Sequence, residues 1–238
     1  MSKIRIYIES KDISELIEIK NKNLIHKIRN VLRLGKEDSL YVFDGRGKEY
    51  LYGIEAIAKK SILIKRESLS ESSLVGNRRI ILGFPLVKED KIDFILQKAT
   101  ELGVDGFIPF VCERTLKIKV TDKKIERWKR IITEALRQSE RLWMPSVSRV
   151  LDFKDIISSN YKVKLAASIR GENLNTVLSD QEEEILILVG PEGGFSNSEY
   201  NQFKENNFKF FKLSSHILRV ETASIFSVGL INYFCDKK

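Results

Sequence analysis

The chain of 238 residues has no apolar run that approaches the roughly 18 residues needed to span a bilayer. Its first ten residues, MSKIRIYIES, alternate apolar with polar or charged side chains, so we expect no signal peptide. A hydrophobic share of 42% and a charged share of 31% are typical of a soluble globular protein. These features argue against a membrane protein and predict a cytoplasmic one.

Cysteine and histidine are scarce, with two of each. Cys112 and Cys235 lie far apart and outside any C-x-x-C pattern, which favours buried thiols over a disulfide or a metal pair. His26 and His216 alone cannot complete a metal site. We therefore expect a protein of a reducing compartment that holds no metal.

The common signatures of phosphate and hydrolase sites are also missing. There is no G-x-x-x-x-G-K-[ST] loop and no H-E-x-x-H helix, and nothing resembles a Ser-His-Asp triad. The G-x-G in Asp44-Gly45-Arg46-Gly47 stands between two expected strands, so it is a hairpin signal and not a dinucleotide loop. An ordinary P-loop or Rossmann enzyme is thereby disfavoured.

Basic residues are in excess, with 41 Lys or Arg against 33 Asp or Glu, a formal charge of +8. The excess is concentrated in residues 112–149, which hold eleven Lys or Arg against five Asp or Glu. Such a distribution favours a polyanionic partner such as nucleic acid, although lysine-rich surfaces also serve solubility.

Residues 1–72 are predicted to form a small β-barrel. Short segments with strand-like alternation occur at 4–8, 40–43, 50–57 and 61–65. A Ser-rich stretch, 67–78, is the predicted linker to a second domain at 73–238.

An amphipathic helix is predicted within this barrel, over residues 24–34, with Gly35 as its C-terminal cap. Its polar side carries His26, Arg29 and Arg33. This side is either a solvated face or a surface for RNA phosphates, and the small barrel around it favours the second interpretation.

Residues 73–238 alternate between strand and helix. This order predicts a mostly parallel sheet with helices on both faces. Strands are expected at 79–86, 107–111, 163–168, 185–189 and 208–213, and helices at 91–103, 122–141, 196–206 and 222–234.

The stretch ILILVGPEGGFSNS (185–198) is predicted to form a strand, a glycine loop and a helix start. Ser196 and Glu199 have the spacing of a capping box, and Phe195 with Tyr200 that of a hydrophobic staple. A glycine loop between a strand and a helix N-terminus is a common ligand site in α/β sheets, yet it is equally consistent with a tight turn. A second loop, SSHILRVETA (214–223), is expected at the same sheet edge, so that a pocket forms between the two.

Several blocks of the sequence, taken together and in order, resemble one family. They are HKIRNVLRLGKEDSLYVFDG, KIDFILQKATELGVDGFIPF, ERWKRIITEALRQSERLWMP, LVGPEGGFSNSE and LSSHILRVETA. The chain is similar to the RsmE family, bacterial 16S ribosomal RNA uridine N3-methyltransferases of the SPOUT superfamily. The combination of GPEGGFS with LR-x-ETA carries the resemblance, because each block alone is weak.

The resemblance implies that residues 1–72 form a PUA-like barrel that helps to bind RNA, and that residues 73–238 form a SPOUT domain with a C-terminal trefoil knot. It also implies S-adenosyl-L-methionine as the cofactor, 16S ribosomal RNA or the small ribosomal subunit as the partner, and a homodimer as the active unit. General topology rules make knots rare, so only the resemblance predicts this one.

The resemblance also assigns site residues. The cofactor pocket is implied to contain Val189, Gly190, Glu192, Gly193, Gly194, Leu213, Ile217, Leu218, Arg219, Thr222 and Ala223. RNA contacts are implied or expected for His26, Arg29, Arg33, Arg114, Arg137, Gln138 and Arg141. Ser214 and His216 depart from the family pattern, which usually has glycine and often arginine there.

The sequence shows no obvious base for the proton on uridine N3. Arg219 is the candidate catalytic residue, as a cation that stabilises the uridine anion. A structural ion pair of Arg219 with Glu192 or Glu221 is the alternative. Competing functions are another SPOUT RNA methyltransferase, a non-enzymatic RNA-binding protein, and a nucleotide-binding α/β enzyme.

Overall fold

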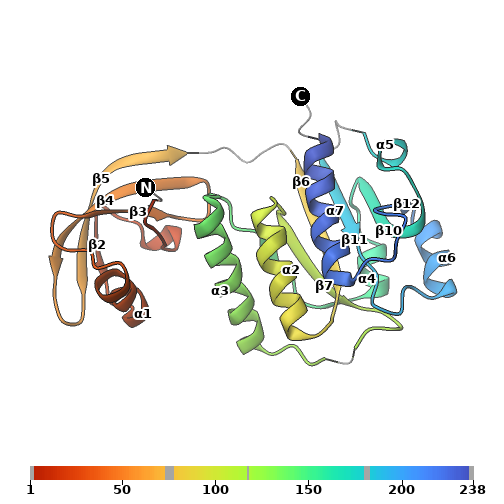
Figure 1. Ribbon diagram of the computed structural model, residues 1–238, viewed down its shortest axis with the longest axis horizontal. Helices are drawn as coiled ribbons and strands as arrows, with labels where there is room; N and C mark the ends of the chain where they lie inside the picture. Colours follow the sequence, from red (N-terminus) through yellow and green to blue (C-terminus); the bar gives the residue numbers. More distant parts are fainter. Residues whose placement is uncertain (1–2, 73–77, 117, 180–182, 236–238) are drawn as a thin grey trace. The chain divides into compact units, whose positions relative to one another are not determined.

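The computed structural model describes residues 3–72, 78–116, 118–179 and 183–235. The chain forms two compact units. The first comprises Met1–Val75 with Glu140–Met144, and the second comprises Gly76–Ser139 with Pro145–Lys238. Figure 1 shows the helices and strands of both units.

The first unit is the predicted β-rich unit. Its five-stranded sheet has the order β1-β3-β4-β5-β2, with β1 parallel to β3 and the other pairs antiparallel. Alternate residues such as Leu40, Val42 and Ile64 face a core of aliphatic side chains. The elements are β1 (Arg5–Tyr7), η1 (Ser10–Asp12), β2 (Leu16–Ile19), α1 (Lys22–His26), η2 (Lys27–Val31), β3 (Ser39–Phe43), β4 (Lys48–Ile57) and β5 (Ile62–Ser72).

The single helix predicted over 24–34 is wrong in its form. The α-helix ends at His26 and continues as the π-helical turn η2, in which the Leu32 N–H bonds the Lys27 carbonyl at 2.9 Å. Arg33, two residues after the end of the turn, has a φ of 55° and so adopts the left-handed conformation expected at Gly35. Sequence periodicity does not distinguish an α-helix from a π-helical turn here, because the turn inserts one residue without changing the apolar composition.

Strand β5 is longer than predicted and runs to Ser72, where it pairs with Lys48. Part of the Ser-rich stretch taken as a linker is therefore strand, and residues 73–77 lie outside the described residues. Residues 65–72 of β5 are all exposed. This part of the strand therefore lacks the alternation of apolar and polar residues by which a sequence reveals a strand.

Residues 140–144, which follow α3 in the sequence, belong to the first unit. The Gly47 N–H bonds the Leu142 carbonyl at 3.0 Å, and the Met144 N–H bonds the Gly45 carbonyl at 2.9 Å. The buried Arg5 donates to the Arg141 carbonyl at 3.3 Å and pairs with buried Glu49. The helix expected to reach residue 141 thus ends at Ser139.

The second unit is the predicted mostly parallel sheet. Its strand order is β12-β10-β11-β6-β7-β8, with β9 also paired to β7, and every pair is parallel. The strands are β6 (Arg79–Pro85), β7 (Gly106–Val111), β8 (Ser146–Val147), β9 (Leu151–Asp152), β10 (Val163–Glu172), β11 (Glu184–Leu188) and β12 (Lys209–Phe211).

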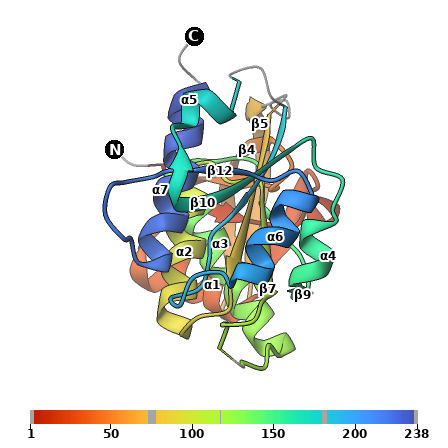
Figure 2. The same cartoon turned by 90° about the vertical axis from the view of Figure 1, so that its right-hand side faces the viewer.

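Helices cover both faces of this sheet (Figure 2). On one face α2, α3 and α7 pack together, and Trp128 of α3 contacts Phe84 of β6. On the other, Phe153 of α4 and Phe203 of α6 belong to one aromatic core with Phe110 and Phe195. The helices are α2 (Glu89–Glu101), α3 (Asp122–Ser139), α4 (Phe153–Ile157), α5 (Leu174–Val177), α6 (Asn197–Glu205) and α7 (Val220–Cys235).

The C-terminal segment returns from the sheet edge to its centre. Strand β12 lies at the edge beside β10, yet α7, which follows it, packs on α2 and on the central strand β6. Where the chain crosses β10, a Cβ at Gly171 would lie 2.5 Å from the Phe211 carbonyl carbon, so only glycine fits there. This return path is the one that the expected trefoil knot needs.

Candidate active site

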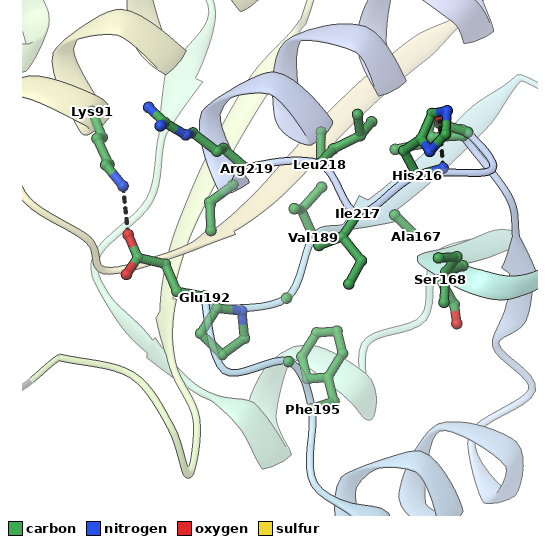
Figure 3. A pocket seen from close by; sticks show the side chains of 18 of the residues that line it. Lys91, Ala167, Ser168, Val189, Glu192, Phe195, His216, Ile217, Leu218 and Arg219 are labelled. Carbon is green, nitrogen blue, oxygen red and sulfur yellow. Dashed lines mark hydrogen bonds and ion pairs between the residues drawn. The ribbon is translucent and has the colours of Figure 1, made fainter.

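The two loops singled out in the sequence meet at a cavity of about 690 Å³ at the carboxyl ends of the parallel strands (Figure 3). Open α/β sheets bind ligands at this edge. Nine of the predicted cofactor residues line the cavity, namely Val189, Gly190, Glu192, Gly194, Leu213, Ile217, Leu218, Arg219 and Ala223. Gly193 and Thr222 do not line it.

The glycine loop is closed by a turn in which the Gly194 N–H donates to the Pro191 carbonyl at 2.8 Å. Gly194 has a φ of 68°, a left-handed conformation that favours glycine. Both local predictions are confirmed: Ser196 and Glu199 form a capping box, and the rings of Phe195 and Tyr200 pack 6.2 Å apart. The loop is therefore anchored to the start of α6.

A neighbouring loop, residues 112–115 after β7, fixes the glycine loop from outside the cavity. The buried Glu199 carboxylate accepts from the Ser196 N–H at 2.7 Å with one oxygen and from the Glu113 N–H at 2.9 Å with the other. Arg114 donates to the Gly193 carbonyl at 2.7 Å. Arg114, predicted to contact RNA, thus lies against the backbone of the cofactor loop.

Replacement of Glu199 by glutamine is expected to destabilise this junction. An amide has a single acceptor oxygen, so one of the two N–H groups loses its partner, which costs about 1–3 kcal/mol. The midpoint of thermal unfolding should fall by about 2–4 °C for each kcal/mol. Glu205→Gln, at the exposed end of the same helix, is the matched control. Equal midpoints for both variants would contradict the role assigned to Glu199.

One end of the cavity is charged. Lys91 of α2 pairs with Glu192 and lies 3.8 Å from Glu221 (Figure 3). The hydrogen bond between them raises the pKa of Lys91 and lowers the pKa of Glu192. Arg219 lies on the same side, exposed, and makes no ion pair with any described residue. The ion pair with Glu192 that the alternative interpretation assigned to Arg219 is therefore formed by Lys91.

The opposite end of the cavity is formed by residues that sequence analysis missed. Ala167, Ser168 and Ile169 in β10 line it, as does Phe195. Ser214 and His216, the two departures from the family pattern, also line it, and the His216 N–H donates to the Ser214 hydroxyl at 3.1 Å. The position of β10 next to β11 is the signal that identifies these residues, and it exists only once the strand order is known.

The side chain of Ile217 points into the cavity between the two loops (Figure 3) and is 90% exposed. Its methyl groups therefore form an apolar part of the cavity wall. Apolar walls, open backbone at a glycine loop and a charged end suit a small molecule with both an apolar and an ionic part.

The residues predicted to contact RNA are divided between the units. In the first unit, His26 and Arg29 line a second cavity, whereas Arg33 does not. The backbone carbonyl of Arg141 accepts a hydrogen bond from Arg5. In the second unit, Arg137 pairs with Glu134 on α3, and Gln138 is exposed.

Among the described residues, no group of three His, Cys, Asp or Glu side chains is arranged to hold a metal ion. None of the helices in the described ranges is long and apolar enough to cross a membrane.

Two protein-family models match the chain. One described as RNA methyltransferase domain matches residues 76–232, and one described as RNA methyltransferase PUA domain matches residues 16–65.

Individual proteins resemble the whole chain. Ribosomal RNA small subunit methyltransferase E of Rickettsia conorii is 32% identical over 98% of both chains. The crystal structure of the protein of the same name from Neisseria gonorrhoeae, bound to S-adenosyl methionine, has a TM-score of 0.89 at 27% identity over 99% of this chain and 100% of that one. A methyltransferase from Legionella pneumophila, solved with bound SAM, has a TM-score of 0.89 at 25% identity over 98% of both chains.

Proposed function

Because the chain belongs to the family of ribosomal RNA small subunit methyltransferases E, we propose that it methylates N3 of a uridine in 16S ribosomal RNA with S-adenosyl-L-methionine. The observation that carries the proposal is the single cavity formed by the GPEGG loop and the 213–223 loop. We propose that residues 1–72 bind RNA and that residues 73–238 carry out methyl transfer. Action on ribosomal RNA implies the cytoplasm as its location.

The cavity fits S-adenosyl-L-methionine. Its volume of about 690 Å³ lies within the range of small-molecule sites. Ile217, Leu218 and Val189 offer apolar contact for an adenine ring, while the glycine loop offers backbone groups. The charged end offers Lys88 to a carboxylate.

When bound, the cofactor supplies a methyl group on a sulfonium centre. The chain must hold the uracil so that N3 lies in line with this methyl group at roughly 3–3.5 Å. Reaction breaks the N3–H and S–C bonds and forms the N3–C bond, with the N3 proton passing to water. Of the described residues that line the cavity, Glu192 is the one carboxylate, and Lys91 already lowers its pKa. A carboxylate of low pKa is a weak base, so stabilisation of the uracil anion by Arg219 is the main chemical contribution that we assign to the protein.

Calorimetric titration with S-adenosyl-L-methionine and S-adenosylhomocysteine tests the proposal first. Binding of ATP or NAD instead would favour a nucleotide-binding enzyme, and no binding at all would favour an RNA-binding protein without activity. Mapping of methylated nucleotides in ribosomal RNA from a deletion strain then distinguishes uridine N3 from the target of another SPOUT methyltransferase.

A homodimer is part of the proposal, supported by an apolar surface on α7 and the end of α2. Phe226 and Tyr233 of α7 are 44% and 65% exposed, and Leu102 beside them is 40% exposed. Exposed apolar side chains grouped in this way are typical of a protein interface. The surface adjoins the cavity through Arg219 and Val220, where α7 begins.

The double variant Phe226→Glu/Tyr233→Glu is expected to be monomeric, because four carboxylates would meet in the interface without partners. Sedimentation velocity measures the change. Leu116→Glu, at an apolar residue that is 49% exposed elsewhere, is the control and should leave the dimer intact. A wild-type monomer, or a dimer that survives the double change, would refute this part.

A further inference from the structure

A second cavity, of about 720 Å³, lies within the first unit and is strongly basic. Three segments line it: the end of β2 with Lys20, the α1–η2 helix with Lys22 and Arg29, and the β4–β5 turn with Lys59 and Lys60. Against these five cations stands one carboxylate, Glu18, so that the lining is net +4. Glu18 is already paired with Lys20 at 2.7 Å.

Arg29 is held in place at this cavity. Its Nη1 donates to the carbonyls of Ala58 at 3.2 Å and of Lys59 at 3.5 Å, so the guanidinium bridges the helix and the β4–β5 turn. No carboxylate among the described residues pairs with it. An arginine fixed by backbone carbonyls keeps its charge and its other N–H groups for an incoming anion.

The π-helical turn η2 forms part of the cavity wall. Arg29 and Asn30 belong to the turn, and Ile25 and His26 precede it on the same wall. A π-turn is strained relative to an α-helix and is frequent at functional sites. The buried Ile25 supplies an apolar patch among the cations, which suits a base or ribose beside a phosphate.

We propose that this cavity is an anchoring site for RNA, which binds backbone phosphates through its five cations and takes one nucleotide into its interior. The proposal rests on the proposed function, which assigns RNA binding to residues 1–72, and it names the site within them. The cavity is of nucleotide size, and specific sites for a small ligand are concave. A concave site favours an RNA nucleotide over the flat surface of an anionic membrane.

The test uses the full-length protein and a fluorescein-labelled single-stranded RNA from 16S ribosomal RNA, with anisotropy measured over a range of salt concentrations. The variant is Lys59→Glu/Lys60→Glu, at two exposed turn residues whose replacement spares the core. The control is Lys36→Glu/Lys65→Glu, which changes the charge of the same unit equally at exposed residues that do not line the cavity.

The cavity variant is expected to bind the RNA about tenfold or more weakly, with a salt slope lower by roughly 0.7 for each lost phosphate contact. The control should lose less than about threefold, because it removes only diffuse charge. Equal losses in both variants would overturn the proposal. So would unchanged RNA binding together with loss of binding to phosphatidylserine vesicles, which would indicate a membrane site.

Calorimetry with S-adenosyl-L-methionine separates this inference from the proposed function. The cavity variant should retain the wild-type affinity for the cofactor. If the wild-type protein does not bind the cofactor but RNA binding still depends on Lys59 and Lys60, the proposed function fails and the anchoring site stands. If the cofactor binds and methyl transfer occurs while both variants bind RNA alike, the anchoring site fails alone.

Discussion

Replacement of Gly190 by valine is expected to weaken binding of S-adenosyl-L-methionine about 100-fold while the protein stays folded. A Cβ at this position would lie 3.0 and 3.1 Å from two carbons of the Phe195 ring. Phe195 cannot move aside, because it is 6% exposed and packs against Phe110, Phe153 and Phe203. The glycine loop must shift instead, and this loop forms one wall of the cavity.

The expected size of the effect is a rise in Kd of about 100-fold, equivalent to about 2.7 kcal/mol. Overpacking of this kind costs about 1–3 kcal/mol of stability, which the chain should tolerate. Calorimetry gives the affinity, and circular dichroism with thermal unfolding confirms the fold.

Gly193→Ala is the matched control in the same loop. Its Cβ would meet the Cδ of Arg114 at 3.2 Å, on the side of the loop away from the cavity. Arg114 is exposed and flexible, so it can move. The affinity should stay close to that of the wild type. Similar losses in both variants would mean that any added bulk disturbs the loop, and a Gly190→Val protein that binds normally would remove the loop from the cofactor site.

The parts of the site that sequence predicted correctly depend on local rules. The capping box at Ser196 and the Phe195–Tyr200 staple need only residues a few positions apart, and their side chains allow few other arrangements. The meeting of the GPEGG and LRVETA loops follows from parallel strands, whose carboxyl ends share one edge. The family resemblance, carried by the same motifs, is confirmed by relatives over the whole chain.

The parts that sequence missed depend on long-range pairing. Lys91 reads as an ordinary polar residue at a helix start, and only the fold brings it to Glu192, 101 positions later. Residues 140–144 continue a basic helical pattern, yet hydrogen bonds to the β3–β4 turn assign them to the first unit. The π-turn at Lys27–Val31 has the same apolar spacing as a regular helix over its short length, so periodicity could not reveal it.

Replacement of Arg219 by alanine is expected to lower methyl transfer at saturating cofactor by about 10²–10³-fold, the usual effect of removing one group that stabilises developing negative charge. Arg219 is exposed at the charged end of the cavity, and Glu192 is paired with Lys91 instead. Arg219 makes no ion pair with any described residue, so its removal breaks none and stability should change by no more than about 0.5 kcal/mol. Single-turnover rates with a purified RNA substrate measure the loss.

Two further readouts distinguish stabilisation of the uracil anion from a role in holding the cofactor. If Arg219 only binds the cofactor carboxylate, the variant should show a higher Kd for S-adenosyl-L-methionine and a normal rate once that site is saturated. If it stabilises the anion, the rate stays low at saturation and rises more steeply with pH than that of the wild type. This is so because N3 is protonated at neutral pH, and a higher pH supplies in solution the anion that the protein no longer favours.

Arg219→Lys keeps the charge and should recover part of the rate. A normal rate for Arg219→Ala at saturating cofactor would show that the reaction does not need this cation, and Lys88 and Lys91 would then be the cations left to test among the described residues that line the cavity.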